Sequence, residues 1–102
     1  MSVTTLTRWK GGMREAIVEA ARKAKKLHHD NLAESFELSQ ILAGQHAGEW
    51  LIIIRYPSWA AYGRCQEELM KSAEYQKLLA EVSAMATMSA RDILFDVDLS
   101  EP

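Results

Sequence analysis

The hydrophobic positions of this chain follow a two-residue period in some segments and a helical period in others. Residues 3–9, 34–43 and 88–99 alternate between two sets of side chains, and each is rich in β-branched, aromatic or aliphatic residues. Alternation of this kind is typical of a β-strand with one buried face. The three segments are therefore expected to be strands, with residues 100–102 as a frayed tail.

A fourth segment, residues 49–56, does not alternate. It contains four consecutive aliphatic residues, Leu51 to Ile54, between Gly48 and Pro57. Such a run is typical of a strand that is covered on both faces, which places it in the middle of a sheet. The short, glycine-containing link at residues 44–48 joins it to the preceding strand, so these two strands are expected to form a hairpin.

Two segments have helical spacing. Residues 13–27 carry one apolar stripe among charged positions, and residues 59–86 carry a second. Ser58 and Ser72 each precede an apolar stripe, where a serine hydroxyl can accept a hydrogen bond from a first-turn amide. The second helical region is therefore expected to begin just after Ser58 and to be kinked or broken near Ser72.

The order β-α-β-β-α-β predicts an α+β, ferredoxin-like fold. Both β-α-β crossovers are right-handed, so both helical regions lie on the same face of a four-stranded antiparallel sheet. A length of 102 residues suits one domain, residues 1–102, with one core.

The opposite face of that sheet needs a cover. Leu51 and Ile53 would lie on one face of the middle strand, and Ile52 and Ile54 on the other. If half of a face of roughly 600 Å² is apolar, burying it contributes on the order of 7 kcal/mol per subunit before association costs. We therefore expect an obligate homodimer in which two sheets pack face to face and form a barrel.

Composition excludes several classes of partner. Twelve Lys and Arg residues against 14 Asp and Glu give a net charge of −2, which offers no field for nucleic acid or an acidic membrane. The longest apolar run, residues 50–54, is too short to span a bilayer. The N-terminus has no secretory signal pattern, so a cytoplasmic location is expected. The single Cys65 fits a reducing compartment, and we interpret it as a small core residue.

Two short segments of the sequence resemble the signature of a known family. Residues 54–62, Ile-Arg-Tyr-Pro-Ser-Trp-Ala-Ala-Tyr, and residues 72–76, Ser-Ala-Glu-Tyr-Gln, are similar to the signature of dimeric α+β barrel proteins. That superfamily includes antibiotic-biosynthesis monooxygenases, haem-degrading enzymes, lactone-forming and isomerising enzymes, and stress-related proteins. The resemblance implies the fold and the dimer, and it is poorly specific for a reaction.

Two departures limit what the resemblance implies. Arg55 stands where several relatives carry an acidic residue. The only asparagine, Asn31, follows the first helix, whereas the haem-degrading and quinone-forming relatives place a functional asparagine on the first strand. Neither of those activities is carried over to this chain.

Three polar side chains are candidates for catalysis: Arg55, Tyr62 and His46. Arg55 either forms an ion pair, with Glu37 or Asp92 as partner, or contacts a ligand anion. Tyr62 can direct its hydroxyl into a cavity between the sheet and the helices. His46 lies in the hairpin turn, where it is either a base or a solvated turn residue.

Aromatic residues supply the candidate ligand contacts. Trp9, Trp50 and Trp59 can form the floor of a hydrophobic cavity, or they belong to the core or the dimer interface. The run His28-His29-Asp30 has metal-ligand residue types, but adjacent helical positions diverge by about 100°, so we interpret it as an exposed helix end and expect no metal. Without a phosphate loop or a spaced Cys/His cluster, any catalysis is expected to need no cofactor.

Two functions remain open. One is a cofactor-independent monooxygenase-like or isomerase-like enzyme acting on a hydrophobic organic molecule. The other is a non-catalytic dimeric module that binds an apolar ligand or acts in a stress response. An enclosed pocket of about 300 Å³ or more that contains Arg55 or a histidine would favour the enzyme, and a solidly packed interior would exclude it.

Overall fold

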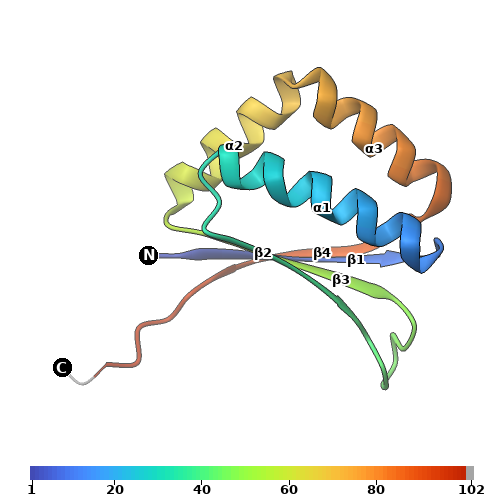
Figure 1. Ribbon diagram of the computed structural model, residues 1–102. Helices are drawn as coiled ribbons and strands as arrows, with labels where there is room; N and C mark the ends of the chain where they lie inside the picture. Colours follow the sequence, from blue (N-terminus) through green and yellow to red (C-terminus); the bar gives the residue numbers. More distant parts are fainter. Residues whose placement is uncertain (101–102) are drawn as a thin grey trace.

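The computed structural model describes residues 1–100 of the chain. The order of elements follows the predicted β-α-β-β-α-β pattern, with the second helical region divided in two (Figure 1). The elements are β1 (Val3–Lys10), α1 (Arg14–Asp30), β2 (Ser35–Gln40), β3 (Trp50–Tyr56), α2 (Trp59–Lys71), α3 (Ala73–Met85) and β4 (Thr87–Phe95).

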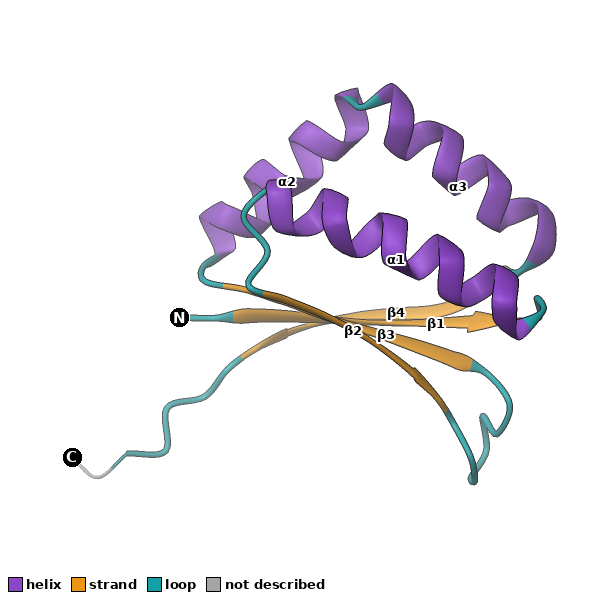
Figure 2. Cartoon of the chain, in the orientation of Figure 1, coloured by secondary structure: helices purple, strands orange, loops and turns teal. Residues whose placement is uncertain are grey.

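The four strands form one antiparallel sheet in the order β2-β3-β1-β4. All three helices cover the same face of this sheet, and the other face is bare in the single chain (Figures 1 and 2). The predicted ferredoxin-like α+β fold is confirmed. The apolar segment β3 lies between β2 and β1, as its unbroken run of aliphatic residues predicted.

The two faces of the sheet differ in polarity and in cover. Val3, Thr5, Thr7 and Trp9 of β1 are buried under the helices, and the alternate residues of β1 are only partly covered. In the same way Trp50, Ile54 and Tyr56 of β3 face the helices and are buried. Leu51, Ile53 and Arg55 alternate with them and so lie on the bare face, which we call the open face.

A complete break separates α2 from α3. Ser58 accepts a hydrogen bond from the amide of Ala61 at 3.0 Å, and Ser72 accepts one from Tyr75 at 3.1 Å. Both serines are therefore N-caps, as predicted. The break lets α2 pack on β3 and leaves α3 packed on α1.

A glycine pair governs the turn from β1 into α1. Gly11 and Gly12 both have a positive φ, and a Cβ atom on Gly12 would lie 2.7 Å from the Ile17 side chain. A larger residue here would be strained and would collide with the first turn of the helix.

Two strands end earlier than the alternation predicted. β2 covers Ser35–Gln40 rather than residues 34–43, and the side chain of Leu42 is 91% exposed. β4 ends at Phe95, and Val97 and Leu99 continue the apolar alternation outside the sheet with 77% and 88% exposure. The alternation itself is real, but the pairing ends soon after Phe95: the amide of Asp96 donates a last hydrogen bond to the carbonyl oxygen of Ser2 at 3.1 Å.

Other expectations concern the core, the tail and membranes. Cys65 is fully buried, as predicted, and contributes to a core cluster with Tyr56 and Leu69. Of the tail expected at residues 100–102, residues 101–102 lie outside the described residues. Among the helices of the described chain, none is long and apolar enough to cross a membrane.

Candidate functional site

A cavity of about 230 Å³ lies between the sheet and the three helices. Every strand and every helix contributes to its wall, which is mainly apolar, and within residues 1–100 no Asp or Glu side chain lines it. Apart from the two tryptophans, its polar side chains are Thr5, Thr7, His28, Gln66, Tyr75 and Arg91. The volume is below the value expected for an enzyme pocket, but the interior is not solidly packed.

Small residues explain why this space is empty. α1 presents Ala20, Ala21 and Ala24 to the cavity, and β1 presents Thr5 and Thr7 from below. Side chains this short do not fill the gap that a helix and a sheet leave between them. The hydroxyl of Thr5, which is 1% exposed, has no hydrogen-bond partner among the described residues.

Two of the three predicted tryptophans reach the cavity. Trp9 and Trp50 are paired across β1 and β3, are nearly fully buried, and belong to one core cluster. Trp50 is held by a hydrogen bond from its indole nitrogen to the carbonyl oxygen of Gly11 at 3.1 Å. Trp59 lies outside the wall: it is 54% exposed, stacks on Tyr62, and packs against Phe95 in a tilted arrangement.

His28 corrects the expectation of an exposed helix end. Its side chain is only 4% exposed, lines the cavity, and packs against the rings of Phe36 and Tyr75. Nδ1 lies 2.7 Å from the carbonyl oxygen of Ala24, one helical turn earlier. Because a carbonyl can only accept, Nδ1 carries the proton and Nε2 keeps its lone pair. Burial lowers the pKa of His28 below its ordinary value, so the neutral ring is favoured.

Arg91 brings a positive charge to the same cavity. It lies on β4 beside Thr7 of β1, and its Nη2 atom donates a hydrogen bond to the Tyr62 hydroxyl at 3.2 Å. Burial raises the pKa of Tyr75, and the charge of Arg91 opposes that shift. Tyr62 is thus near the cavity but not part of its wall, and it contacts a residue that is.

Arg55 lies on the open face and does not line the cavity. Its ion-pair partner is Asp96, with 3.6 Å between Nη1 and Oδ2, and the expected partners Glu37 and Asp92 were wrong. The register explains the error, because it places Glu37 beside Ile53 and Asp92 two residues farther along the sheet. Both partners of the actual pair are about half exposed, so the pair contributes about 0–1 kcal/mol.

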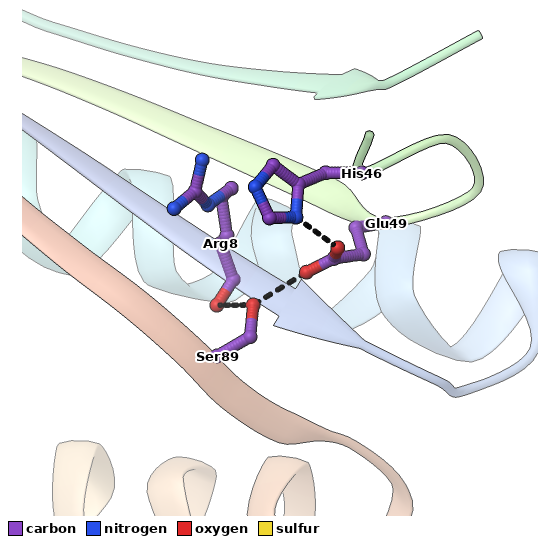
Figure 3. A network of polar contacts seen from close by, with 4 residues as sticks. All are labelled: Arg8, His46, Glu49 and Ser89. Carbon is purple, nitrogen blue, oxygen red and sulfur yellow. Dashed lines mark hydrogen bonds and ion pairs between the residues drawn. The ribbon is translucent and has the colours of Figure 1, made fainter. Parts of the chain in front are cut away.

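His46 belongs to a polar network on the open side of the sheet (Figure 3). Its Nδ1 lies 2.8 Å from one carboxylate oxygen of Glu49, and the hydroxyl of Ser89 donates to the other. Ser89 reaches Glu49 because a bulge in β4, opposite Arg8 and Trp9, adds one residue to that strand. The hydrogen bond from Ser89 is the main reason why the pKa of Glu49 lies below its ordinary value.

The order of groups in this network does not suit nucleophilic catalysis. A serine nucleophile needs a base in contact with its hydroxyl, with the acid behind the base. Here the carboxylate of Glu49 lies between Ser89 and His46. These contacts instead hold the loop at residues 41–49 against β4, the edge strand opposite β2. Elsewhere in residues 1–100, no group of three or more His, Cys, Asp or Glu side chains could hold a metal ion.

The structure therefore does not bring the three polar candidates together. Arg55 and His46 lie on the open side, and Tyr62 lies at the margin of the cavity. His28 and Arg91, which sequence reasoning did not select, line the cavity itself. Their signals were weak: His28 continues the apolar stripe four residues after Ala24, and Arg91 is a charged residue in an otherwise apolar strand face.

Comparisons with known proteins place the chain in a family. A family's sequence pattern matches residues 2–94, and its description is "Domain of unknown function (DUF6854)". The chain belongs to this family. A search of curated proteins found no match.

Solved structures share the fold of this family member at low sequence identity. Rv0793 from Mycobacterium tuberculosis is 19% identical with a TM-score of 0.71, over 99% of this chain and all of that one. SnoaB, a cofactor-independent oxygenase from Streptomyces nogalater, is 14% identical with a TM-score of 0.67, over 98% of each chain. An uncharacterized NIPSNAP-like domain protein from Burkholderia xenovorans is 11% identical with a TM-score of 0.71, over 99% of this chain and 90% of that one. The resemblance to antibiotic-biosynthesis-monooxygenase-like proteins is confirmed at the level of the fold.

Proposed function

We propose that this protein is a cofactor-independent monooxygenase-like or isomerase-like enzyme that acts on a small hydrophobic organic molecule in the cavity. The observation that carries the proposal is His28, a buried and neutral imidazole in the wall of an apolar cavity. Nδ1 is held by the carbonyl of Ala24, which orients the ring and leaves the lone pair of Nε2 to accept a proton. The likeness of fold to a cofactor-independent oxygenase supports the proposal without specifying a reaction.

Proton removal is the step that these residues suit. Both isomerisation and cofactor-free oxygenation can begin by removing an acidic proton from a substrate carbon or hydroxyl. A general base must be unprotonated at the working pH, and its basicity falls as its pKa falls. Burial lowers the pKa of His28, which keeps the ring unprotonated at neutral pH.

Deuterium exchange into 2-tetralone tests this role without knowledge of the natural substrate. The ketone has two fused rings and acidic protons next to its carbonyl, and exchange in D₂O is followed by NMR. The protein is expected to accelerate exchange over buffer, and His28→Gln is expected to lose about 10²-fold or more of that acceleration. His29→Gln is the matched control, because His29 is the exposed neighbour of His28 and should leave the rate unchanged.

Oxygen consumption separates the two reaction types. Uptake of dioxygen with 2-tetralone, measured with an electrode, would favour the monooxygenase-like reaction, and exchange without uptake would favour isomerisation. If 2-tetralone binds but exchanges no faster than in buffer, the catalytic proposal fails. The alternative, a non-catalytic dimeric ligand-binding or stress-response module, then stands. One observation favours that alternative: the His28 ring is packed between Phe36 and Tyr75, as a structural core histidine would be.

The assembly that we propose is a homodimer formed by the open face. Arg8 and Arg55 on this face accompany Glu37 and Asp92, so two copies related by a two-fold axis can place opposite charges against each other. The apolar residues of the face include Leu94, which is 40% exposed. A second copy of the chain would cover both the apolar and the charged residues.

A further inference from the structure

Arg91 is an exposed arginine that lines the cavity. Arg22, Arg55 and Lys71, which are also exposed, each form an ion pair with a carboxylate. Within residues 1–100, Arg91 forms no ion pair, and its guanidinium contacts the neutral Tyr62 hydroxyl. Among the described residues, Arg91 is the only charged side chain in the cavity wall. No Asp or Glu of the described residues lies in that wall.

A guanidinium beside an apolar cavity favours an anion. Arg91 is exposed, so its guanidinium stays hydrated at the edge of the cavity, and a ligand anion can reach it there. Arginine has five donors in a planar fork that matches the two oxygens of a carboxylate. Only one of those donors has an acceptor in a described side chain, the Tyr62 hydroxyl. Water can reach the other donors of this exposed side chain, and an oxyanion would replace that water and supply an opposite charge.

The strand register divides the cavity into a polar and an apolar part. Trp9, Trp50 and Met88 form one cross-strand row. Thr7 and Arg91 lie in the next row, about 7 Å farther along the strands, since two residues rise about 3.3 Å each. The Arg91 side chain continues away from the tryptophans, because it reaches Tyr62 near the start of α2.

Two further polar groups lie at the arginine side of the cavity. Thr5 is one row beyond Thr7, and its buried hydroxyl has no partner among residues 1–100. His28 packs on Phe36. Phe36 pairs with Ile54, and Ile54 pairs with Thr5, so Phe36 and Thr5 lie in the same cross-strand row. After burial, the positive charge of Arg91 also contributes to the lowered pKa of His28.

We propose that the cavity binds a small apolar molecule that carries one oxyanion, a carboxylate or phenolate. Arg91 and Tyr62 hold the oxyanion, and Trp9 and Trp50 pack against the apolar body. This inference deepens the proposed function and rests on it only in taking the cavity as the ligand site. It specifies the charge and the orientation of the ligand, and it requires no catalytic step.

Binding of two matched probes tests the charge requirement in the unmodified protein. 2-Naphthoate carries a carboxylate, and 2-naphthalenemethanol has the same ring system with a neutral hydroxyl. Both are titrated against the protein by calorimetry, with tryptophan fluorescence as a second readout because Trp9 and Trp50 line the cavity. The carboxylate is expected to bind about tenfold or more tightly than the alcohol, as charge-assisted hydrogen bonds predict.

Variants of Arg91 and Tyr62 then locate the oxyanion. Arg91→Gln is expected to reduce affinity for 2-naphthoate to that for the alcohol and to leave the alcohol unchanged. Arg91→Lys keeps the charge without the fork and should restore part of the preference. Tyr62→Phe removes the neighbouring hydroxyl and should weaken the binding of 2-naphthoate by a smaller factor than Arg91→Gln does. Arg64→Gln removes the same charge from an exposed site on α2 and should change neither affinity. Circular dichroism confirms that each variant is folded.

The outcomes separate this inference from the proposed function. If both probes bind the unmodified protein equally, the oxyanion site is refuted and the cavity remains a ligand site. If 2-naphthoate is preferred but Arg64→Gln reduces the preference as much as Arg91→Gln, the effect is a general surface charge and the assignment fails. If neither probe nor 2-tetralone binds, both this inference and the proposed function fail.

Discussion

At the scale of single residues, two neighbouring histidines have different environments. One residue along a helix is a rotation of about 100°, so His28 faces the sheet and His29 faces solvent. His28 is stabilised in its neutral form by burial, and the carbonyl of Ala24 fixes its tautomer. The residue that sequence reasoning classed with an exposed helix end is therefore the only histidine in the cavity wall among residues 1–100.

The buried histidine predicts how stability depends on pH. The pKa of His28 in the folded protein is lower than its ordinary value of 6.5, so below about pH 6.5 the unfolded chain binds more protons than the folded one. The contribution of His28 to stability is therefore fully present above pH 6.5 and is lost as pH falls from there toward the folded pKa. The free energy of unfolding should fall by at most about 1.4 kcal/mol per pH unit from this group.

Urea denaturation between pH 5 and pH 8 measures this dependence. His28→Gln is expected to flatten the profile below pH 6.5, and His29→Gln should keep the slope of the unmodified protein. Equal slopes for the unmodified protein and His28→Gln would show that His28 does not titrate differently in the folded state.

At the scale of elements, α1 determines the size of the cavity. Its inner face carries Ala20, Ala21 and Ala24 where larger residues would fill the core. Of these, Ala20 lines the cavity and belongs to neither core cluster, so it adjoins the empty space more than the others do. α2 and α3 supply the rest of the helical wall of the cavity. The break at Ser72 changes the direction of the chain between these two helices, so both extend over the sheet (Figure 2).

A larger side chain on α1 that fills the cavity should therefore raise the stability of the protein and weaken ligand binding. Ala20→Leu adds three carbon atoms, and burying them is expected to contribute about 1–2 kcal/mol to the free energy of unfolding. The same change should reduce binding of 2-naphthalenemethanol by at least about tenfold. Thermal denaturation and calorimetry measure the two effects. Ala80→Leu, on the exposed side of α3, is the control and should affect neither. Loss of stability with unchanged binding would mean that Ala20 does not adjoin the cavity.

At the scale of the whole molecule, the sheet has one covered face and one bare face. The bare face carries Leu6, Leu51 and Ile53, which are only partly covered, and Leu94 of β4, which is 40% exposed. Exposed apolar residues that gather on one face of a sheet are typical of a surface that another chain covers. The proposed homodimer is the simplest arrangement that would do so.

Light scattering tests the homodimer directly. At micromolar concentration the protein is expected to have twice its chain mass of 11.5 kDa. Ile53→Glu, in the centre of the open face, should shift it toward the monomer because it places a charge where apolar side chains would meet. Leu42→Glu is the control, since Leu42 is 91% exposed in the loop after β2. A monomer mass for the unmodified protein would refute the dimer.

The sequence by itself determined the sheet, the helices and their order. Period-two and helical spacing are local properties, so the strands were located to within a few residues, and Ser58 and Ser72 identified both helix starts. The same local information placed β3 in mid-sheet. It offered Trp9, Trp50 and Trp59 either as a cavity floor or as core or interface residues, and only the structure showed that Trp9 and Trp50 line the cavity.

Only the tertiary structure decided which polar side chains share a site. Whether Arg55 meets Glu37, Asp92 or Asp96 depends on strand register, and whether Ser89 reaches Glu49 depends on a single bulge. These are relations between segments far apart in the chain, which no local period encodes. The cavity has the same origin: small side chains on α1 and β1 leave a space only because the fold places them opposite each other. For that reason His28 and Arg91 emerged as site residues only after the helix was packed on the sheet.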